Sequence, residues 1–230
     1  YQNVLSLSNH AWKELTPMPE GRSGMVSFIT EQSEPAYYGG SSWIENRKQI
    51  HPTGYALRND MWHLLGSLKK PIAYAAVAGE KSLHYAAGGT DGISLHSSLI
   101  TLGPSRQNSE IEIITSQARI YAGATLIDGA FYQVGGSTNL SPLIPSTDIS
   151  KFEHGSWRSV GHLPESPLIN PAVATWKNSI FVAGGGIPKA DGLKNTDSVF
   201  LFDTTERTWT KRADLPAPTR GSVAHSVPGL

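Results

Sequence analysis

The chain has 230 residues, a formal net charge of zero and no cysteine. Its length can bury one sizeable core, and its balanced charge gives no broad electrostatic footprint for nucleic acid. The lack of cysteine excludes disulfides, thiolate metal sites and cysteine nucleophiles. No continuous apolar run reaches the roughly 18 residues that a membrane-spanning helix needs, so we expect no membrane span.

Four diglycines divide the chain into similar units, and each one ends a short apolar run. They are Gly39-Gly40, Gly88-Gly89, Gly135-Gly136 and Gly184-Gly185, at intervals of 49, 47 and 49 residues. A fixed period of about 50 residues, with a strand before each diglycine, is typical of kelch-type β-propellers. We therefore predict an all-β fold of this type.

Each predicted unit opens with a tryptophan and a Pro-containing turn, followed by a strand of small residues and the apolar strand before the diglycine. A polar loop and two further strands complete it. The openings are marked by Trp12, Trp62, Trp157 and Trp209, and the third unit lacks its tryptophan. The predicted four-stranded blades span residues 12–61, 62–114, 115–156 and 157–208, within one domain of residues 1–230.

The two ends, residues 1–11 and 209–230, are predicted to form partial blades, which leaves the propeller open. An open end exposes a bare sheet edge and the apolar face of a blade, and both are costly. Either the two ends share an unusual fifth blade, or the chain is part of a longer six-bladed propeller. We expect the second arrangement.

A more specific pattern lies between Pro35 and Gly92. A long loop follows the first diglycine, and after it come Trp62, Gly66-Ser67-Leu68 and the pair Ala73-Tyr74. With these motifs the segment resembles the bacterial sialic acid mutarotases (N-acetylneuraminate epimerases), and the blade order resembles their cyclically permuted branch. The resemblance implies a periplasmic or secreted isomerase of carbohydrate metabolism that needs no cofactor.

Two departures from this family stand out. Ile72 occupies the place where the family has an arginine before the alanine-tyrosine pair. The family's proposed catalytic pair, a Glu with an Arg six residues further on, has no match in the corresponding segments. By blade order, we expect that pair beyond Leu230.

The loops after the diglycines and the Pro-rich turns are expected to share one rim around the propeller axis, where a small polar ligand could bind. Mutarotation needs a base at the anomeric hydroxyl and an acid at the ring oxygen, and we predict Glu45 and His51 for proton transfer. Arginine suits a carboxylate, and an indole suits the face of a sugar. The predicted substrate-binding residues are Arg22, Trp43, Arg47, Asp91, Asn139 and Arg220.

Each of these residues also has a purely structural interpretation. Arg22 and Arg220 follow Pro-rich turns and would cap neighbouring loops. Glu45 and Arg47 would form a solvated pair of little energetic value. His51 would be a turn residue, since a proline follows it.

Two functions from different classes remain open. The first is a sugar mutarotase with a small carbohydrate ligand. The second is a non-catalytic kelch propeller that binds a glycan or a protein partner. The loops after the four diglycines differ from one another, which favours a pocket for one specific small ligand. The eight histidines show no metal-binding spacing, and no serine nucleophile elbow is present, so neither a metal enzyme nor a serine hydrolase is expected.

Overall fold

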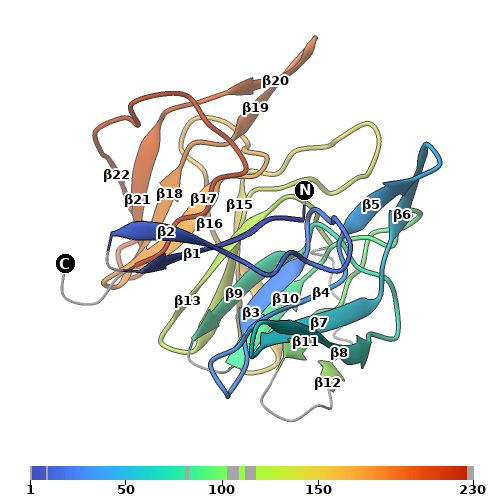
Figure 1. Cartoon of the computed structure of the whole chain (residues 1–230). Coiled ribbons are helices and arrows are strands. Elements are labelled where there is room, and N and C mark those ends of the chain that lie inside the picture. Colours follow the sequence, from blue (N-terminus) through green and yellow to red (C-terminus); the bar gives the residue numbers. More distant parts are fainter. Residues whose placement is uncertain (1, 9, 81–82, 103–108, 112–117, 227–230) are drawn as a thin grey trace.

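A computed structural model describes residues 2–8, 10–80, 83–102, 109–111 and 118–226 (Figure 1). These residues form antiparallel strands and no helix. They make four sheets of four strands and three two-stranded sheets. The all-β prediction is confirmed.

The four large sheets are numbered here in chain order. Sheet 1 contains β3 (Val26–Ile29), β4 (Pro35–Tyr38), β7 (Thr53–Arg58) and β8 (Met61–Ser67). Sheet 2 contains β9 (Ala76–Glu80), β10 (Leu83–Ala87), β11 (Leu99–Leu102) and β12 (Ser109–Ile111). Sheet 3 contains β13 (Gly123–Ile127), β14 (Ala130–Val134), β15 (Asp148–Glu153) and β16 (Ser156–His162). Sheet 4 contains β17 (Ala172–Trp176), β18 (Ser179–Ala183), β21 (Val199–Asp203) and β22 (Trp209–Lys211).

Three hairpins complete the strands. They are β1–β2 (Val4–Ser8, Ala11–Leu15), β5–β6 (Ser41–Ile44, Arg47–Ile50) and β19–β20 (Gly186–Lys189, Gly192–Asn195). The last two are insertions between the second and third strands of sheets 1 and 4, and both project from the same end of the molecule (Figure 1). The N-terminal end, expected to supply one strand of an earlier blade, supplies the paired strands β1 and β2.

The tryptophans lie at a different place in the sheets from the predicted one. Trp62, Trp157 and Trp209 lie on the last strands β8, β16 and β22, so they close a sheet where the sequence units were predicted to open one. The predicted blade bounds are therefore displaced by one strand. Each indole packs on aromatic rings of its own sheet, as Trp62 does on Tyr37 with ring centroids 5.4 Å apart.

The indole of Trp62 also links two successive units, because its Nε1–H donates to the backbone carbonyl of Thr16 at 3.0 Å. Trp62→Phe is expected to lower the free energy of unfolding by about 1–2 kcal/mol, since that carbonyl loses its donor. Trp43→Phe is the matched control, because Trp43 is 71% exposed and makes no such bond to the scaffold. Urea denaturation measures both, and equal losses in the two variants would contradict the assigned role.

The first strand of each sheet lies innermost. β13 lies beside both β9 and β17. Between β13 and β17, the hydroxyl oxygens of Thr125 and Thr175 are 2.6 Å apart. The apolar core fills the spaces between successive sheets. One cluster joins Val26 and Tyr38 of sheet 1 to Ile100 of sheet 2, and similar clusters join sheets 2 and 3 and sheets 3 and 4. Face-to-face packing of successive sheets is the arrangement expected of propeller blades.

The diglycines hold the start of the next unit close to the end of the apolar strand. The N–H of each second glycine donates to a backbone carbonyl one unit later, and we call the accepting residue the anchor position. The anchor residues accepting from Gly40, Gly89, Gly136 and Gly185 are Ile72, Arg119, Leu168 and Thr219. Arg22 holds the same position before sheet 1, because its neighbour Ser23 bridges Ser41 as Ile169, the neighbour of Leu168, bridges Gly186.

Candidate functional site

One residue of each unit adopts a left-handed backbone at the same end of the inner strands. Successive residues of this set are joined by backbone hydrogen bonds of 2.8–3.1 Å, each N–H donating to the carbonyl of the preceding residue. The set consists of Gly24, Tyr74, Tyr121, Asn170 and Gly221, all with φ between 51° and 69°. Two of the five positions carry a tyrosine, and their rings lie 4.8 Å apart between centroids.

Tyr74 is the centre of a polar cluster at this end of the molecule, which we call the axial cluster. Its hydroxyl lies 2.6 Å from the Ser41 Oγ, which in turn lies 3.1 Å from the Ser23 Oγ. The ammonium of Lys48 lies 4.5 Å from the centre of the Tyr74 ring. The axial cluster therefore contains a phenol, two hydroxyls and one exposed cation.

The surroundings of Tyr74 lower its pKa relative to an ordinary tyrosine. Burial raises the pKa of Tyr74, but hydrogen bonds from Lys48, Ser41 and Ser23, together with the positive charge of Lys48, lower the pKa below its ordinary value. For the neighbouring Tyr121, burial is the main reason that the pKa is raised, and the proximity of Tyr74 adds to it. Two adjacent phenols whose pKa values are pushed apart are a feature of acid–base sites.

The hairpin β5–β6 decides which predicted residues reach the axial cluster. Trp43 pairs with Lys48 across the hairpin and lies two residues after Ser41, so these three side chains share one face. Arg47 lies on the opposite face of the hairpin. Glu45 lies in the turn with φ of 49° and is exposed. Of the residues predicted on this hairpin, only Trp43 is thus placed on the face of the axial cluster.

His51 belongs to a second polar group, on the other side of β5. The Ser42 Oγ lies 2.7 Å from the His51 Nε2 and donates to the Glu20 Oε1 at 3.1 Å. The other carboxylate oxygen of Glu20 accepts from the guanidinium of Arg22. A His51 ring protonated at Nε2 would complete a chain of donors from imidazole to hydroxyl to carboxylate.

His51 is buried, and its protonated form is disfavoured. Burial and the nearby charge of Arg22 lower the pKa of His51, and the carboxylate of Glu20 opposes this with a smaller effect. Glu20 has a lowered pKa, because hydrogen bonds and charge from Arg22, His51 and Ser42 outweigh its burial. The group therefore holds a neutral imidazole against an ionised carboxylate.

This ionisation pattern makes stability depend on pH. The unfolded chain binds a proton at His51 near the ordinary value of 6.5, whereas the folded protein binds it only at lower pH. The free energy of unfolding should therefore fall as pH drops below that value. His51→Gln should show a smaller decrease in melting temperature between about pH 7.5 and about pH 5.5 than the unchanged protein.

The matched control for this pH effect is His225→Gln, since His225 is exposed near the C-terminus. It should keep the full decrease in melting temperature. The contribution of Glu20 to stability is lost only as pH falls below its ordinary pKa of 4.5. That range lies outside the window from about pH 7.5 to about pH 5.5. An unchanged pH response in His51→Gln would show that His51 carries none of it.

Arg22 is a part of the scaffold in this structure. Its side chain is 3% exposed, and its guanidinium donates to the carbonyls of Gly39 and Thr53, the Thr53 hydroxyl and the Glu20 carboxylate. These contacts use all five N–H groups. A substrate carboxylate would have to displace them, so Arg22 does not offer the predicted ligand contact here.

The remaining predicted residues serve their own loops or stand apart from the axial cluster. Asp91 accepts the backbone N–H groups of Ile93 and Ser94 at 2.8 Å each, and these bonds, led by that of Ser94, lower the pKa of Asp91 despite some burial. Asn139 donates to the carbonyl of Pro142 at 2.8 Å. Arg220 is exposed on the segment after β22.

Sequence reasoning missed Lys48 and the role of Tyr74. The family motif contains Tyr74 but gives it no role. The same position is held by Gly24, Tyr121 and Asn170 in the other units. That recurrence, together with the tolerance of glycine and asparagine for left-handed backbone, was the available signal. Lys48 had none, because its approach to Tyr74 depends on the register of the hairpin.

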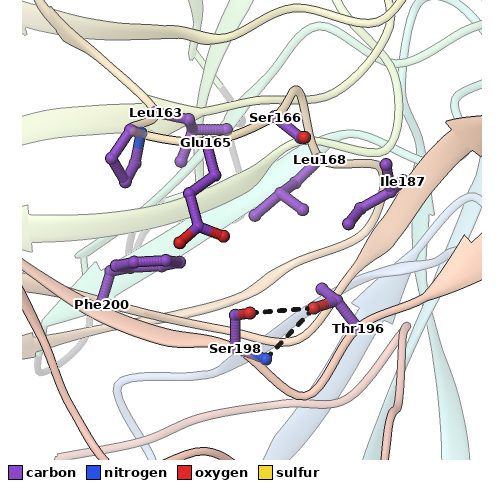
Figure 2. Close-up of a pocket in the computed structure, with 9 residues that line it drawn as sticks. Leu163, Glu165, Ser166, Leu168, Ile187, Thr196, Ser198 and Phe200 are labelled. Carbon is purple, nitrogen blue, oxygen red and sulfur yellow. Dashed lines mark hydrogen bonds between the residues drawn. The ribbon is translucent and has the colours of Figure 1, made fainter.

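Within the described residues, no group of three or more histidine or acidic side chains could hold a metal ion. Those residues also include no helix that is long and apolar enough to cross a membrane. A shallow pocket lies at sheet 4, and none of the residues that line it belongs to the axial cluster (Figure 2).

Comparisons with known proteins bear on the fold. Residues 167–216, which contain all of sheet 4, match the Kelch motif family. Among solved structures, the chain is similar to one described as "Structure of YjhT", with a TM-score of 0.71 and 16% sequence identity. This likeness covers 89% of this chain and 73% of the other. No curated protein sequence matches. The four antiparallel sheets, the Kelch motif in the last of them and this structural likeness together identify the fold as a kelch-type β-propeller.

Proposed function

We propose that the protein is a sugar mutarotase that interconverts the anomers of sialic acid at the axial cluster. The observation that carries the proposal is the environment of Tyr74, whose hydroxyl contacts Ser41 at 2.6 Å and whose pKa is lowered by Lys48 despite burial. Lys48 lies over the ring of this phenol, and Trp43 is its cross-strand partner on the same face of β5–β6. The sequence from Pro35 to Gly92, which resembles the sialic acid mutarotases, contains all of these residues.

The reaction needs only proton transfers. The Tyr74 phenolate takes the proton of the anomeric hydroxyl, the bond between the anomeric carbon and the ring oxygen breaks, and the Lys48 ammonium gives a proton to that oxygen. Rotation about the bond next to the new carbonyl carbon presents its other face to the hydroxyl. Reversal of both proton transfers then closes the ring to the other anomer. Lys48 stabilises the phenolate and attracts the carboxylate of the sugar, and Trp43 offers an apolar face to the ring.

The test is the rate of anomer interconversion. Exchange spectroscopy by proton NMR on N-acetylneuraminate gives this rate with and without the folded protein. Faster exchange in proportion to protein concentration is expected. A rate equal to that in buffer, with a preparation shown to be folded by circular dichroism, would reject the proposal.

A second function is favoured by exposed apolar side chains on the loops that follow the diglycines. Ile93 is 91% exposed, Trp43 71% and Ile144 55%, and each lies on a loop or hairpin that follows a diglycine. Such residues are typical of surfaces that bind a glycan or a protein partner without turnover. Ligand-dependent thermal stabilisation with no acceleration of exchange would support this function over the first.

A further inference from the structure

The recess at sheet 4 lies at an anchor position without an arginine. Leu168 holds this position in sheet 4 and Ile72 holds it in sheet 2, whereas sheets 1 and 3 have Arg22 and Arg119 there. Figure 2 shows the residues that line the recess. They lie on the segment that leads into sheet 4, on β19 and at the beginning of β21. The recess is shallow: the empty space between its lining residues is about 270 Å³ only when the adjoining open solvent is included. The lining residues are Leu163, Pro164, Glu165, Ser166, Leu168, Ile187, Thr196, Ser198 and Phe200.

At two other anchor positions the corresponding space is filled by a guanidinium. Arg22 donates to the carbonyls of Gly39 and Thr53 at 3.0 Å each. Arg119 donates in the same way to the carbonyls of Gly135 and Asp148 at 2.9 Å each. Each guanidinium therefore reaches the first glycine of its diglycine and the residue at the start of the third strand.

Sheet 4 keeps this setting but lacks the arginine. Leu168 holds the anchor position and has no hydrogen-bond donor on its side chain. Ser198 holds the place of Thr53, because the N–H of Gly184 donates to the Ser198 carbonyl as that of Gly39 does to the Thr53 carbonyl. Two residues further on, Phe200 takes the place of Tyr55, whose ring centre lies 5.7 Å from the guanidinium carbon of Arg22.

A carboxylate also faces the recess. Figure 2 shows the Glu165 carboxylate directed toward Phe200 and Ser198. In sheet 1 the acidic residue of the corresponding segment, Glu20, pairs with the anchor arginine at 3.1 Å. Among the described residues, no basic side chain forms an ion pair with Glu165. Sheet 4 thus has a carboxylate three residues before its anchor position and no arginine at that position, whereas Glu20 lies two residues before Arg22.

We propose that this recess binds the guanidinium group of an arginine side chain supplied by a protein partner. The Glu165 carboxylate receives the planar fork, the Phe200 ring lies against its face, and the Ser198 hydroxyl accepts a further N–H. The apolar side chains of Leu163, Leu168 and Ile187 contact the methylene stem. The site is distinct from the axial cluster, and it does not depend on the proposed mutarotase activity.

The test titrates N-acetyl-L-arginine amide into the folded protein and follows backbone amide shifts by NMR. Shifts confined to the segment 163–168 and the residues around 196–200 are expected, with a dissociation constant in about the millimolar range for so small a ligand. The lysine and leucine analogues are the matched probes. Binding of the leucine analogue as tightly as the arginine one, or no saturable shifts with arginine, would overturn the proposal.

Two variants separate the parts of the site. Glu165→Gln should weaken arginine binding at least tenfold with no loss of fold, because Glu165 is exposed. Leu168→Arg should abolish binding, because an arginine from within would fill the recess as Arg22 and Arg119 do. Unchanged affinity in Glu165→Gln would reject the site even if Leu168→Arg failed to fold. Methylguanidinium bound as tightly as the capped arginine would overturn the choice of a protein side chain as the ligand.

Discussion

Replacing Tyr74 by phenylalanine is expected to slow the interconversion of sialic acid anomers by about 10²-fold or more, the usual contribution of a positioned acid–base group. The substitution removes the hydroxyl that lies 2.6 Å from Ser41 and keeps the ring that packs on Tyr121. Tyr85→Phe is the control, since Tyr85 packs on Phe131 between sheets 2 and 3. Equal rates in Tyr74→Phe and the unchanged protein would remove Tyr74 from the mechanism.

The pH profile of the same reaction separates proton transfer from a structural role. If the Tyr74 phenolate is the base, the rate should rise with pH and level off below the ordinary pKa of 10.0, because Lys48 lowers the pKa of Tyr74. Lys48→Met removes that hydrogen bond and charge and leaves the effect of burial, which raises the pKa. Lys48→Met also removes the proposed proton donor to the ring oxygen, so its rate should be lower overall and should rise only at higher pH. If Tyr74 has only a structural role, the pH at which the rate rises should be the same in Lys48→Met as in the unchanged protein.

The fold could be predicted because the repeated glycines occupy places where the neighbouring backbone leaves no room for a side chain. A side chain on Gly39 would place its Cβ 2.1 Å from the Ile72 carbonyl oxygen, and one on Gly88 would meet that of Arg119 at 2.2 Å. Both glycines also have φ above 70°. Since no other residue fits such a place, the glycines recur at every unit and reveal the period. The tryptophans recur too, but a period does not tell which strand of a sheet carries them.

The site was harder to predict, because its contacts join residues that no local pattern relates. Tyr74 reaches Ser41 and Lys48 only through the bend before β9 and the register of β5–β6. For Arg22, the contacts fit the structural alternative, a cap on neighbouring loops, and not the predicted ligand contact. A polar residue after a Pro-rich turn suggested an exposed rim, whereas the guanidinium is buried to satisfy carbonyls at strand ends. Its recurrence as Arg119 at the same anchor position was the signal for a structural role.

Arg119→Leu is expected to lower the free energy of unfolding by about 3–5 kcal/mol, since it breaks a buried charge pair by removing one partner. The Arg119 side chain is 1% exposed, and it pairs with the carboxylate of Asp148 at 3.2 Å and donates to the Ser150 hydroxyl. Burial lowers the pKa of Arg119 to about 10, and Asp148 partly offsets this. The loss would remove the guanidinium from two carbonyls and from the Asp148 carboxylate, while the Asp148 carbonyl keeps the Gly135 N–H and its carboxylate keeps the Ser150 and Ser159 hydroxyls.

Sheet 4 supplies the design of the test, because it carries Leu168 and Ser198 where sheet 3 carries Arg119 and Asp148. The double variant Arg119→Leu, Asp148→Ser should therefore recover about 1–2 kcal/mol of the loss, since no partly buried carboxylate is left without its charged partner. Arg158→Leu is the control and should cost about 1 kcal/mol or less, because its ion pair with Glu153 is exposed. Urea denaturation of all three variants gives the comparison. A double variant no more stable than Arg119→Leu would mean that the carbonyls, and not the charge of Asp148, make an arginine necessary at this anchor position.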